Sequence, residues 1–497
     1  MKKIITFLII GGLLVFIACT PKFPEAPQLN ITSNQLVLSK MVYLGNSLTA
    51  GLQSAGLVED FQKHSYPYLI AQQLGKASTF EQPLIADPGI SSTPGVGVLD
   101  FVNGDIVPRG TYTNPLALLL NPTLSRPYDN LGVPGADLND VLNTVDGSGG
   151  NPFFDLILRN PNFAGMTQLE QTIALLPTLV TAWVGSNDVL GAALAGGDLT
   201  QITPPGEFQT NYTAMLTALG GIRGGKVGII LLNVPNVIDI PYINALDNIL
   251  QPIPLLGITN PVPVLFDTTS NANGGVDFVP IDFGGFYLPL YTEEFASGVT
   301  HVLLPTLAEY TDNRLGVPDS AIIATTLITL AGWDTLTASA TAHQLVLGMI
   351  AAGLTPSGVP VPSNLTITAA EEAAIEGAVT GFNQIISGIA GNVGIPVVDA
   401  NQLLHDLNMN GIDGYSGKFI LADPVNTAFS LDGVHPNNGG NAIIANKIIS
   451  LMNTFPDIQI PLINTAQYKG QYVGKPVAKI SKEAANLVKP LFVKNKN

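Results

Sequence analysis

The sequence MVYLGNSLTAG at residues 41–51 joins a short apolar run to a polar segment bounded by glycines. The apolar run is typical of a buried β-strand, and Gly45 marks its end. The residues that follow predict the start of a helix. Ser47 is thus expected at the carboxyl end of a strand, where open α/β proteins bind their ligands. Many serines at such junctions only cap a helix, so this segment alone does not identify a nucleophile.

Three further apolar runs follow along the chain, at residues 179–184, 227–232 and 395–398. Continuous apolar runs of this length are typical of strands in a parallel sheet that is covered on both faces. Helical patterns lie among and after these runs, at residues 208–219, 369–389 and 441–452. This alternation predicts an α/β fold, a three-layer α/β/α sandwich around a mainly parallel sheet.

The pattern loosens between about residues 236 and 367, where proline, asparagine and glycine interrupt it and aromatic residues cluster. We interpret this stretch as one large insertion into an α/β domain of residues 37–456. The apolar, Thr-rich segment 320–331 is too short to span a membrane and predicts a core helix. Residues 457–497 are rich in lysine, and we expect a C-terminal extension outside the core.

The composition restricts the possible partners and the source of stability. The chain of 497 residues has a net charge of −16, with 12% charged and 46% hydrophobic residues. An acidic protein has no electrostatic attraction for phosphate backbones, which argues against nucleic-acid binding. Cys19 is the only cysteine, so no intramolecular disulfide can form and the fold must depend on its hydrophobic core.

The N-terminal residues resemble a bacterial lipoprotein signal sequence. Two lysines precede an apolar run at residues 4–18, shorter than the ~20 residues that a membrane-spanning helix needs. The sequence FIAC at residues 16–19 resembles a lipobox, in which the cysteine is lipidated and becomes the new N-terminus. Phe16 stands where leucine is usual, and an ordinary signal peptide with an incidental cysteine is the alternative.

The lipoprotein interpretation has consequences for location. We expect residues 1–18 to be a signal peptide, Cys19 to be the lipidation site, and residues 19–36 to be a tether. Because each buried CH₂ contributes about 0.8 kcal/mol, several acyl chains would hold the protein firmly on a membrane. The expected location is extracytoplasmic, as a membrane-anchored lipoprotein of the outer membrane or cell surface.

The sequence LDGVHP at residues 431–436 supplies the partners that a nucleophilic serine needs. A serine nucleophile requires a base to take its proton, and that base requires an anion to hold its tautomer. Asp432 lies three residues before His435 across a glycine turn, so it can accept Nδ1–H while Nε2 points outward. An Asx turn before a helix would explain the same residues without catalysis. The other four histidines lack a comparable setting and are expected in packing or surface roles.

Two segments at the expected sheet edge offer hydrogen-bond donors for an oxyanion. NLGVPGA at residues 130–136 is typical of a tight glycine-rich loop whose backbone N–H groups point into a cleft. Asn187 follows the apolar run 179–184 and offers its side-chain amide. With the N–H of Ser47, these groups would form a three-donor oxyanion hole. Each segment alone is also ordinary turn chemistry.

Taken in order, the four motifs resemble the conserved blocks of the SGNH (GDSL-type) hydrolase family. Asn46 stands where the family's Gly-Asp-Ser-Leu block has aspartate, a position outside the triad, so activity is expected to survive. The second-block glycine corresponds to Gly135, with Gly132 as the competing choice. The Gly-x-Asn-Asp block corresponds to residues 185–188, and the Asp-x-x-His-Pro block corresponds to residues 432–436.

The resemblance covers about residues 37–235 and 368–455, and implies an SGNH/flavodoxin-like fold. It also implies a serine esterase or lipase that needs no metal and no organic cofactor. Ser47, Asp432 and His435 would form the triad. Ser47, Gly135 and Asn187 would form the oxyanion hole.

The natural substrate stays open among small-molecule, lipid and acylated-glycan esters. In an esterase or lipase, the aromatic stretch 278–291 would line an acyl pocket or form a lid. A carbohydrate O-acetyl esterase of the same family is one alternative. A non-catalytic surface-binding lipoprotein is another, although such a protein would be expected to lose at least one residue of the set.

Overall fold

The computed structural model describes residues 36–246 except 104, residues 299–351 except 313–314 and 330–331, and residues 356–472 except 360. It also describes the short segments 266–267, 276–277, 279–282, 287–290, 479–480, 484, 487 and 489–493. The expected signal peptide, Cys19 and nearly all of the expected tether lie outside the described residues.

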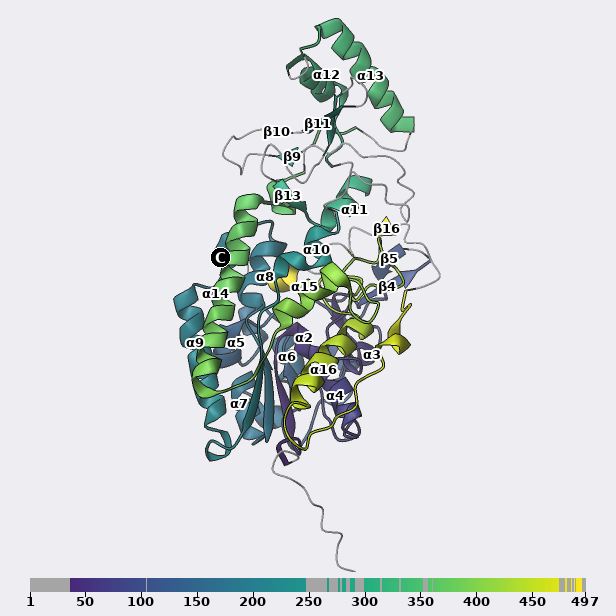
Figure 1. The fold of residues 1–497 in the computed structure, drawn as a ribbon. Coiled ribbons are helices and arrows are strands. Elements are labelled where there is room, and N and C mark those ends of the chain that lie inside the picture. The colour runs from purple at the N-terminus through teal and green to yellow at the C-terminus, as the bar shows by residue number, and fades with distance from the viewer. Residues whose placement is uncertain are drawn as a thin grey trace, which may run out of the picture.

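A five-stranded parallel sheet forms the centre of the molecule (Figure 1). Its strands are β1 (Met41–Gly45), β6 (Asn130–Gly132), β7 (Leu179–Trp183), β8 (Gly228–Leu232) and β15 (Val397–Val398). The strand order is β6-β1-β7-β8-β15, and every neighbouring pair is parallel. All residues of β1 and β7 are buried, as a sheet covered on both faces requires. The predicted α/β class with a parallel sheet is confirmed.

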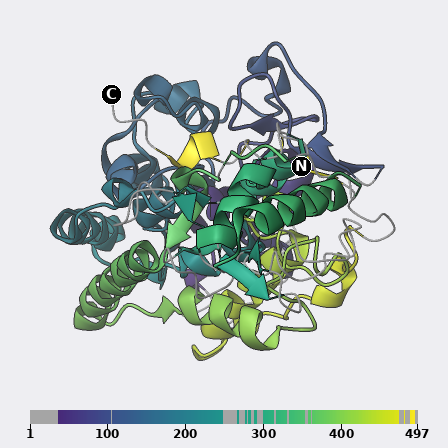
Figure 2. The same cartoon turned by 90° about the horizontal axis from the view of Figure 1, so that it is seen from above.

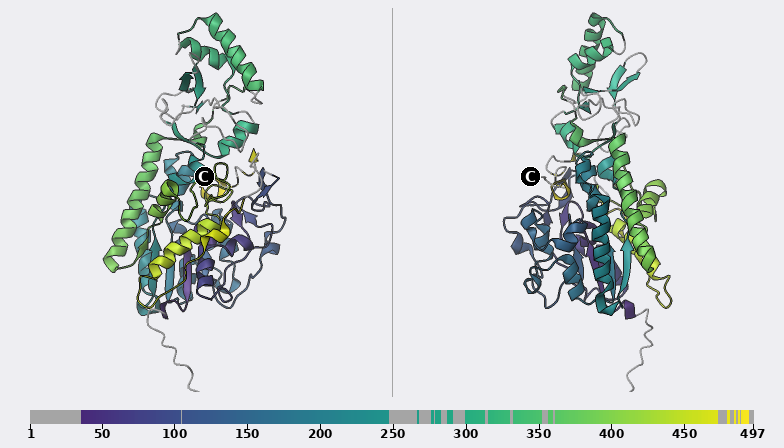
Figure 3. Two further views of the ribbon diagram at one scale, coloured as in Figure 1. Left: turned by 45° about the vertical axis from the view of Figure 1, so that its right-hand side comes forward. Right: turned by 90° about the vertical axis from the view of Figure 1, so that its left-hand side faces the viewer.

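Helices cover both faces of this sheet, because successive strand side chains point to opposite sides. Met41 and Tyr43 share a core cluster with buried residues of α4 (Tyr66–Gln73) and α16 (Asn438–Met452). Leu44 points to the other face, into the cluster that holds buried residues of the next two helices. These helices are α9 (Pro205–Gly220) and α14 (Ala369–Val393). Figure 3 shows the helices on either side of the sheet.

The sequence explains why α14 forms and where it ends. Thr368 caps the helix in a reciprocal pair with Glu371, and Gly394 ends it in the left-handed conformation with φ 69°. One face of the helix is apolar and packs on α9, where Phe208 stacks on Phe382 with ring centroids 4.1 Å apart. The long helix thereby fixes one layer of the fold against the sheet.

Between β8 and α14 the chain leaves the sheet and forms a lobe beside the core. The α-helices described there are α10 (Pro241–Asn244), α11 (Pro305–Asp312), α12 (Ser320–Thr329) and α13 (Thr335–Ala351). Buried residues of α11, α12 and α13 belong to the same core cluster as Leu44. Figure 1 shows α12 and α13 beyond the carboxyl ends of the strands, and Figure 2 shows the lobe from above. The helix expected near 320–331 corresponds to α12, whereas the sequence pattern does not predict α13. The insertion limits 236–367 stay a prediction.

Two sequence-based expectations are wrong. Residues 130–132 were expected to be loop but form β6, which pairs with β1 through Leu131 and Leu44. Three residues with Asn and Gly at the ends carry no readable strand pattern. The tail also enters the core, since Ile458, Ile460 and Ile463 are buried in the α4–α16 cluster. These isoleucines precede the Lys-rich part, which begins only at Lys469, so the lysine content did not describe this stretch.

Within the part of the chain that the structure describes, no helix is both long enough and apolar enough to span a membrane.

Candidate active site

Ser47 is the first residue of the short helix α2 (Ser47–Ala50), directly beyond the carboxyl end of β1. The N-cap of this helix is Asn46, whose Oδ1 accepts a hydrogen bond from the backbone N–H of Leu48 at 3.0 Å. The capping role that a serine often has at such a junction therefore belongs to its neighbour. The hydroxyl of Ser47 is left to interact with another partner.

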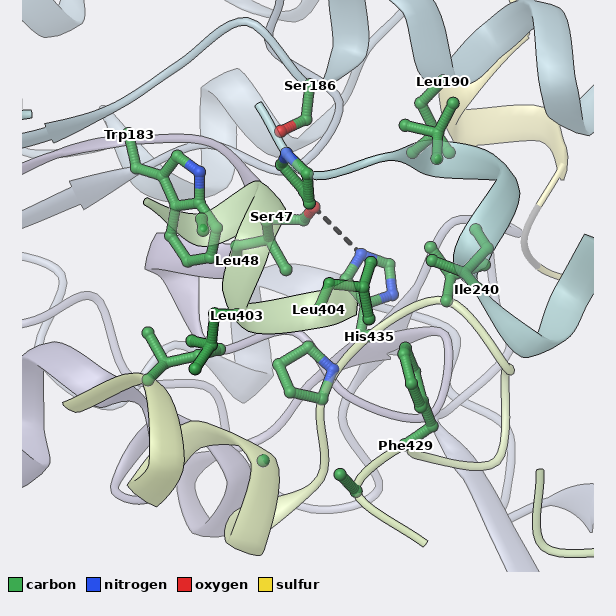
Figure 4. A pocket seen from close by; sticks show the side chains of 18 of the residues that line it. Ser47, Leu48, Trp183, Ser186, Leu190, Ile240, Leu403, Leu404, Phe429 and His435 are labelled. Atoms are coloured by element: carbon green, nitrogen blue, oxygen red, sulfur yellow. Dashed lines mark hydrogen bonds between the residues drawn. The ribbon is translucent and has the colours of Figure 1, made fainter. Parts of the chain in front are cut away.

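That partner is His435, which lies 388 positions later in the chain. The Nε2 atom of His435 is 2.9 Å from Oγ of Ser47, and Figure 4 shows this contact as a dashed line. The Nδ1 atom of His435 is 2.9 Å from Oδ2 of Asp432. All three side chains are buried, with exposed fractions of 1–3%. The structure therefore brings the three residues into one hydrogen-bonded chain that is largely buried.

The carboxylate of Asp432 accepts hydrogen bonds from five donors. Its Oδ2 accepts from Nδ1–H of His435 and from the N–H of Ala55 at 2.8 Å. Its Oδ1 accepts from the N–H of Val434 at 2.8 Å, the N–H of His435 at 2.9 Å, and Oγ of Ser430 at 3.0 Å. Burial raises the pKa of Asp432, but the His435 charge and these hydrogen bonds lower the pKa below its ordinary value of 3.8. Asp432 is therefore an anion at neutral pH and holds the imidazole with Nδ1 protonated.

Asn187 lies shortly after β7 and contacts the loop that follows β6. It is the first residue of α8 (Asn187–Leu194), and its Nδ2 donates to the carbonyl oxygen of Ala136 at 2.7 Å. The neighbouring Asp188 accepts from the N–H of Leu138 at 3.0 Å through Oδ2. These two contacts hold the loop beside the start of α8. An amide nitrogen carries two hydrogens, so one remains for a bound group.

Of the two candidate glycines, Gly132 ends β6 and Gly135 lies in the loop after it, and the hydrogen bonds distinguish them. The N–H of Gly132 already donates to Oδ1 of Asn130 at 3.0 Å. Among the described residues, no acceptor is assigned to the N–H of Gly135 or of Ser47. Gly135 has φ +79°, a conformation that favours glycine. Of the two glycines, Gly135 is therefore the one whose N–H could donate to a bound group.

The C-terminal segment covers this site, which sequence reasoning missed. α18 (Lys489–Phe492) places the Phe492 ring 5.6 Å from the His435 ring at a tilt of 36°. A Cβ atom on Gly135 would lie 2.9 Å from Cδ1 of Leu491, so the segment also lies against the loop. Phe492 is buried with an exposed fraction of 5%. The only sequence signal was an apolar pair within a Lys-rich tail.

A mostly apolar cavity adjoins the serine and the imidazole (Figure 4). Its walls come from α2, the end of β7, α8, the segment 235–240, α15 (Ala400–Asn410) and α16. Only a few polar side chains, among them Asn46 and Asn187, join Ser47 and His435 in the lining. Such a cavity, with few polar groups near one reactive pair, is typical of a small-molecule site.

The remaining histidines in the described segments have other partners or settings. His301 lies 3.4 Å from Glu372, and His64 lies 3.6 Å from Asp60. Within the described residues, no group of three or more His, Cys, Asp or Glu side chains is arranged to hold a metal ion. The expectation that the protein uses no cofactor stays a prediction.

No known protein family matches the chain, and neither a curated protein nor a solved structure matches it. What the site does must therefore be inferred from its own geometry and from the sequence motifs.

If Asn187 supplies an oxyanion donor, as the sequence motifs predict, replacing it by alanine should lower kcat for ester hydrolysis by about 10²–10³. The change would remove one side-chain donor and leave the Ser47–His435 contact in place. Steady-state kinetics on an aryl ester, with Tm measured alongside, checks this. Asn160→Ala is the control, because Asn160 is another buried amide that donates to the carbonyls of Leu124 and Arg126. Equal kinetic losses in both variants would indicate general destabilisation.

Proposed function

We propose that this protein is a serine ester hydrolase that cleaves carboxylic esters through an acyl-enzyme on Ser47. The observation that carries the proposal is the continuous chain from Ser47 to His435 to Asp432, in which both links are 2.9 Å. A serine, a histidine and a buried carboxylate in this order are the groups that activate a hydroxyl for attack.

In the proposed reaction, Oγ of Ser47 attacks the ester carbonyl carbon while Nε2 of His435 takes its proton. The oxyanion that forms accepts hydrogen bonds from Ser47 N–H, Gly135 N–H and the Asn187 amide. The C–O bond to the alcohol then breaks, and the alcohol leaves with the proton from His435. Water attacks the acyl-enzyme with His435 as base, which releases the acid and restores Ser47. Asp432 stabilises the imidazolium in both steps.

The strand order also supports this proposal. Counted along the chain, the five strands lie in the order 2-1-3-4-5, which is the flavodoxin-like arrangement. The four motifs lie at the carboxyl edge of this sheet or beside the serine. Together with the motif resemblance, this supports membership of the SGNH (GDSL-type) hydrolase family as a proposal.

The alternative of a non-catalytic binding protein is less well supported by the geometry. A binding site does not require a serine hydroxyl that is hydrogen-bonded to an imidazole, nor a carboxylate that accepts five hydrogen bonds, one of them from that imidazole.

We also propose, from the sequence resemblance at residues 16–19, that the protein is an extracytoplasmic lipoprotein anchored through Cys19. If Cys19→Ser left the protein fully in the membrane fraction, that anchor would be excluded.

Labelling with a small fluorophosphonate tests the proposed function directly. We expect one covalent adduct, located on Ser47 by peptide mass spectrometry, because only an activated serine reacts rapidly with this reagent. The Ser91→Ala variant should label like the wild type, since the hydroxyl of Ser91 hydrogen-bonds to backbone groups of Thr93 and Val96 and not to a histidine. Labelling of a different serine, or none at all while the protein is folded, would contradict the proposal.

A further inference from the structure

The cavity beside Ser47 has two sides, and in the proposed reaction each side would hold a different part of the ester. In Figure 4 the side chains of Leu48, Trp183 and Leu403 lie on one side of Ser47, and His435 lies on the other. The alcohol must leave toward His435, because Nε2 supplies its proton. The acyl chain must then extend in the opposite direction, toward Leu48, Trp183 and Leu403.

The walls on that side are apolar and firmly held. Trp183 has an exposed fraction of 3%, its Nε1–H donates to the carbonyl of Asn233 at 3.0 Å, and its ring meets Tyr66 edge-on at 5.7 Å. The indole therefore presents carbon to the cavity, with its polar atom already bonded elsewhere. Leu403 of α15 is partly buried and faces the same space.

The lining favours longer aliphatic esters over acetylated sugars. The sugar of such an ester is the alcohol, so it would lie on the His435 side, where Ile240 and Phe429 are among the lining residues. A hydroxyl placed against these side chains would lose its hydrogen bonds to water without gaining new ones, which is unfavourable. On the acyl side, an aliphatic chain gains from leaving water beside Trp183 and Leu403, whereas an acetyl group offers only a methyl group and would gain little.

We propose that Leu48, Trp183 and Leu403 form an acyl pocket, which makes the protein an esterase for aliphatic acids longer than acetate. This inference rests on the proposed function. The cavity volume is about 100 Å³. This volume covers both sides of the cavity. Because an apolar cavity of about 150 Å³ accommodates benzene, the acyl side encloses at most about four chain carbons beyond the carbonyl. The aromatic stretch 278–291, whose side chains lie outside the described residues, is not part of this pocket as defined.

The first experiment varies the acyl chain of 4-nitrophenyl esters from acetyl to dodecanoyl at a constant alcohol. Burial of each additional methylene group is expected to raise kcat/KM about fourfold. We expect kcat/KM to rise at least about tenfold from acetyl to hexanoyl, and to rise no further at decanoyl. Acetylated sugars should be hydrolysed poorly. Wild-type protein that cleaves acetyl esters as well as hexanoyl esters would overturn the acyl pocket.

Two substitutions at Leu403 test the wall itself. Leu403→Phe narrows the pocket and should move the optimum to a shorter chain, whereas Leu403→Ala should move it to a longer one. Ile240→Phe is the matched control on the His435 side of the cavity. It should alter the response to the size of the alcohol and leave the acyl optimum unchanged. An acyl optimum that moves with Ile240 and not with Leu403 would assign the acyl chain to the other side and overturn the proposal.

The experiments distinguish a failure of the proposed acyl pocket from a failure of the proposed serine mechanism. Hydrolysis that is abolished by Ser47→Ala but shows no preference among acyl chains would overturn the pocket and leave the serine mechanism intact. Hydrolysis that persists in Ser47→Ala would reject the mechanism, and the acyl pocket with it. Tm values for each variant show that the compared proteins are folded.

Discussion

Replacing Ser47 by alanine is expected to lower kcat for ester hydrolysis by about 10⁴–10⁶, with little change in KM. In the proposed mechanism the Oγ atom forms the bond to the acyl carbon, so its loss would remove the step that begins the reaction. Binding of the ester depends instead on the cavity walls, which this change leaves in place. The remaining rate comes from oxyanion stabilisation and water attack alone.

Measurement requires a correction for contaminating esterases, so active sites should be counted by burst titration. The variant should give no burst, whereas Ser91→Ala should give the wild-type burst and kcat. We expect Tm of Ser47→Ala to change little, because one hydrogen bond contributes about 1 kcal/mol. Activity above about 1% of wild type that is accompanied by a stoichiometric burst would point to a nucleophile other than this serine.

The sequence allowed the sheet to be predicted because four of its five strands are continuous apolar runs. β7 and β8 match the runs at 179–184 and 227–232 to within one residue at each end. β6 was not predicted because it has only three residues and ends in glycine. A strand of this kind is defined by its pairing with β1, which is a tertiary contact and leaves no periodic pattern.

Spacing alone predicted contacts within the site only over short sequence distances, whereas Ser47 was joined to His435 through the motif resemblance. Asp432 and His435 lie three positions apart, so their contact follows from a local turn. The contact of Asp432 with the N–H of Ala55 joins residues 377 positions apart, and no spacing rule predicts it. The same holds for Phe492 against His435. The proposed acyl pocket was not predicted either, because Trp183 and Leu403 line one cavity only after α15 packs beside the sheet edge.

The carboxylate that supports His435 gives the second large expected effect. Asp432→Asn should lower kcat by about 10⁴, because an amide cannot stabilise the imidazolium and can hold the wrong tautomer. The structure adds a further reason. All five partners of the carboxylate are donors, so the NH₂ group of asparagine must face at least one N–H or O–H group. Asparagine is therefore not a neutral replacement here.

The same argument predicts a loss of stability that depends on pH. We expect Asp432→Asn to lower the free energy of unfolding at pH 7 by about 3 kcal/mol, measured by urea denaturation. Because the pKa of Asp432 is lowered in the folded protein, its stabilising effect is complete above the ordinary value of 3.8. It is lost only as the pH falls below that value toward the lowered pKa.

Ser430→Ala is the control, since it removes one of the five donors and keeps the charge. It should reduce kcat by no more than about tenfold, because the remaining donors still hold the carboxylate on the imidazole. If Asp432→Asn and Ser430→Ala had equal effects on kcat, the negative charge would not be what His435 requires. The carboxylate would then be a structural anchor for the turn at residues 430–435, and the assignment of Asp432 to the triad would be wrong.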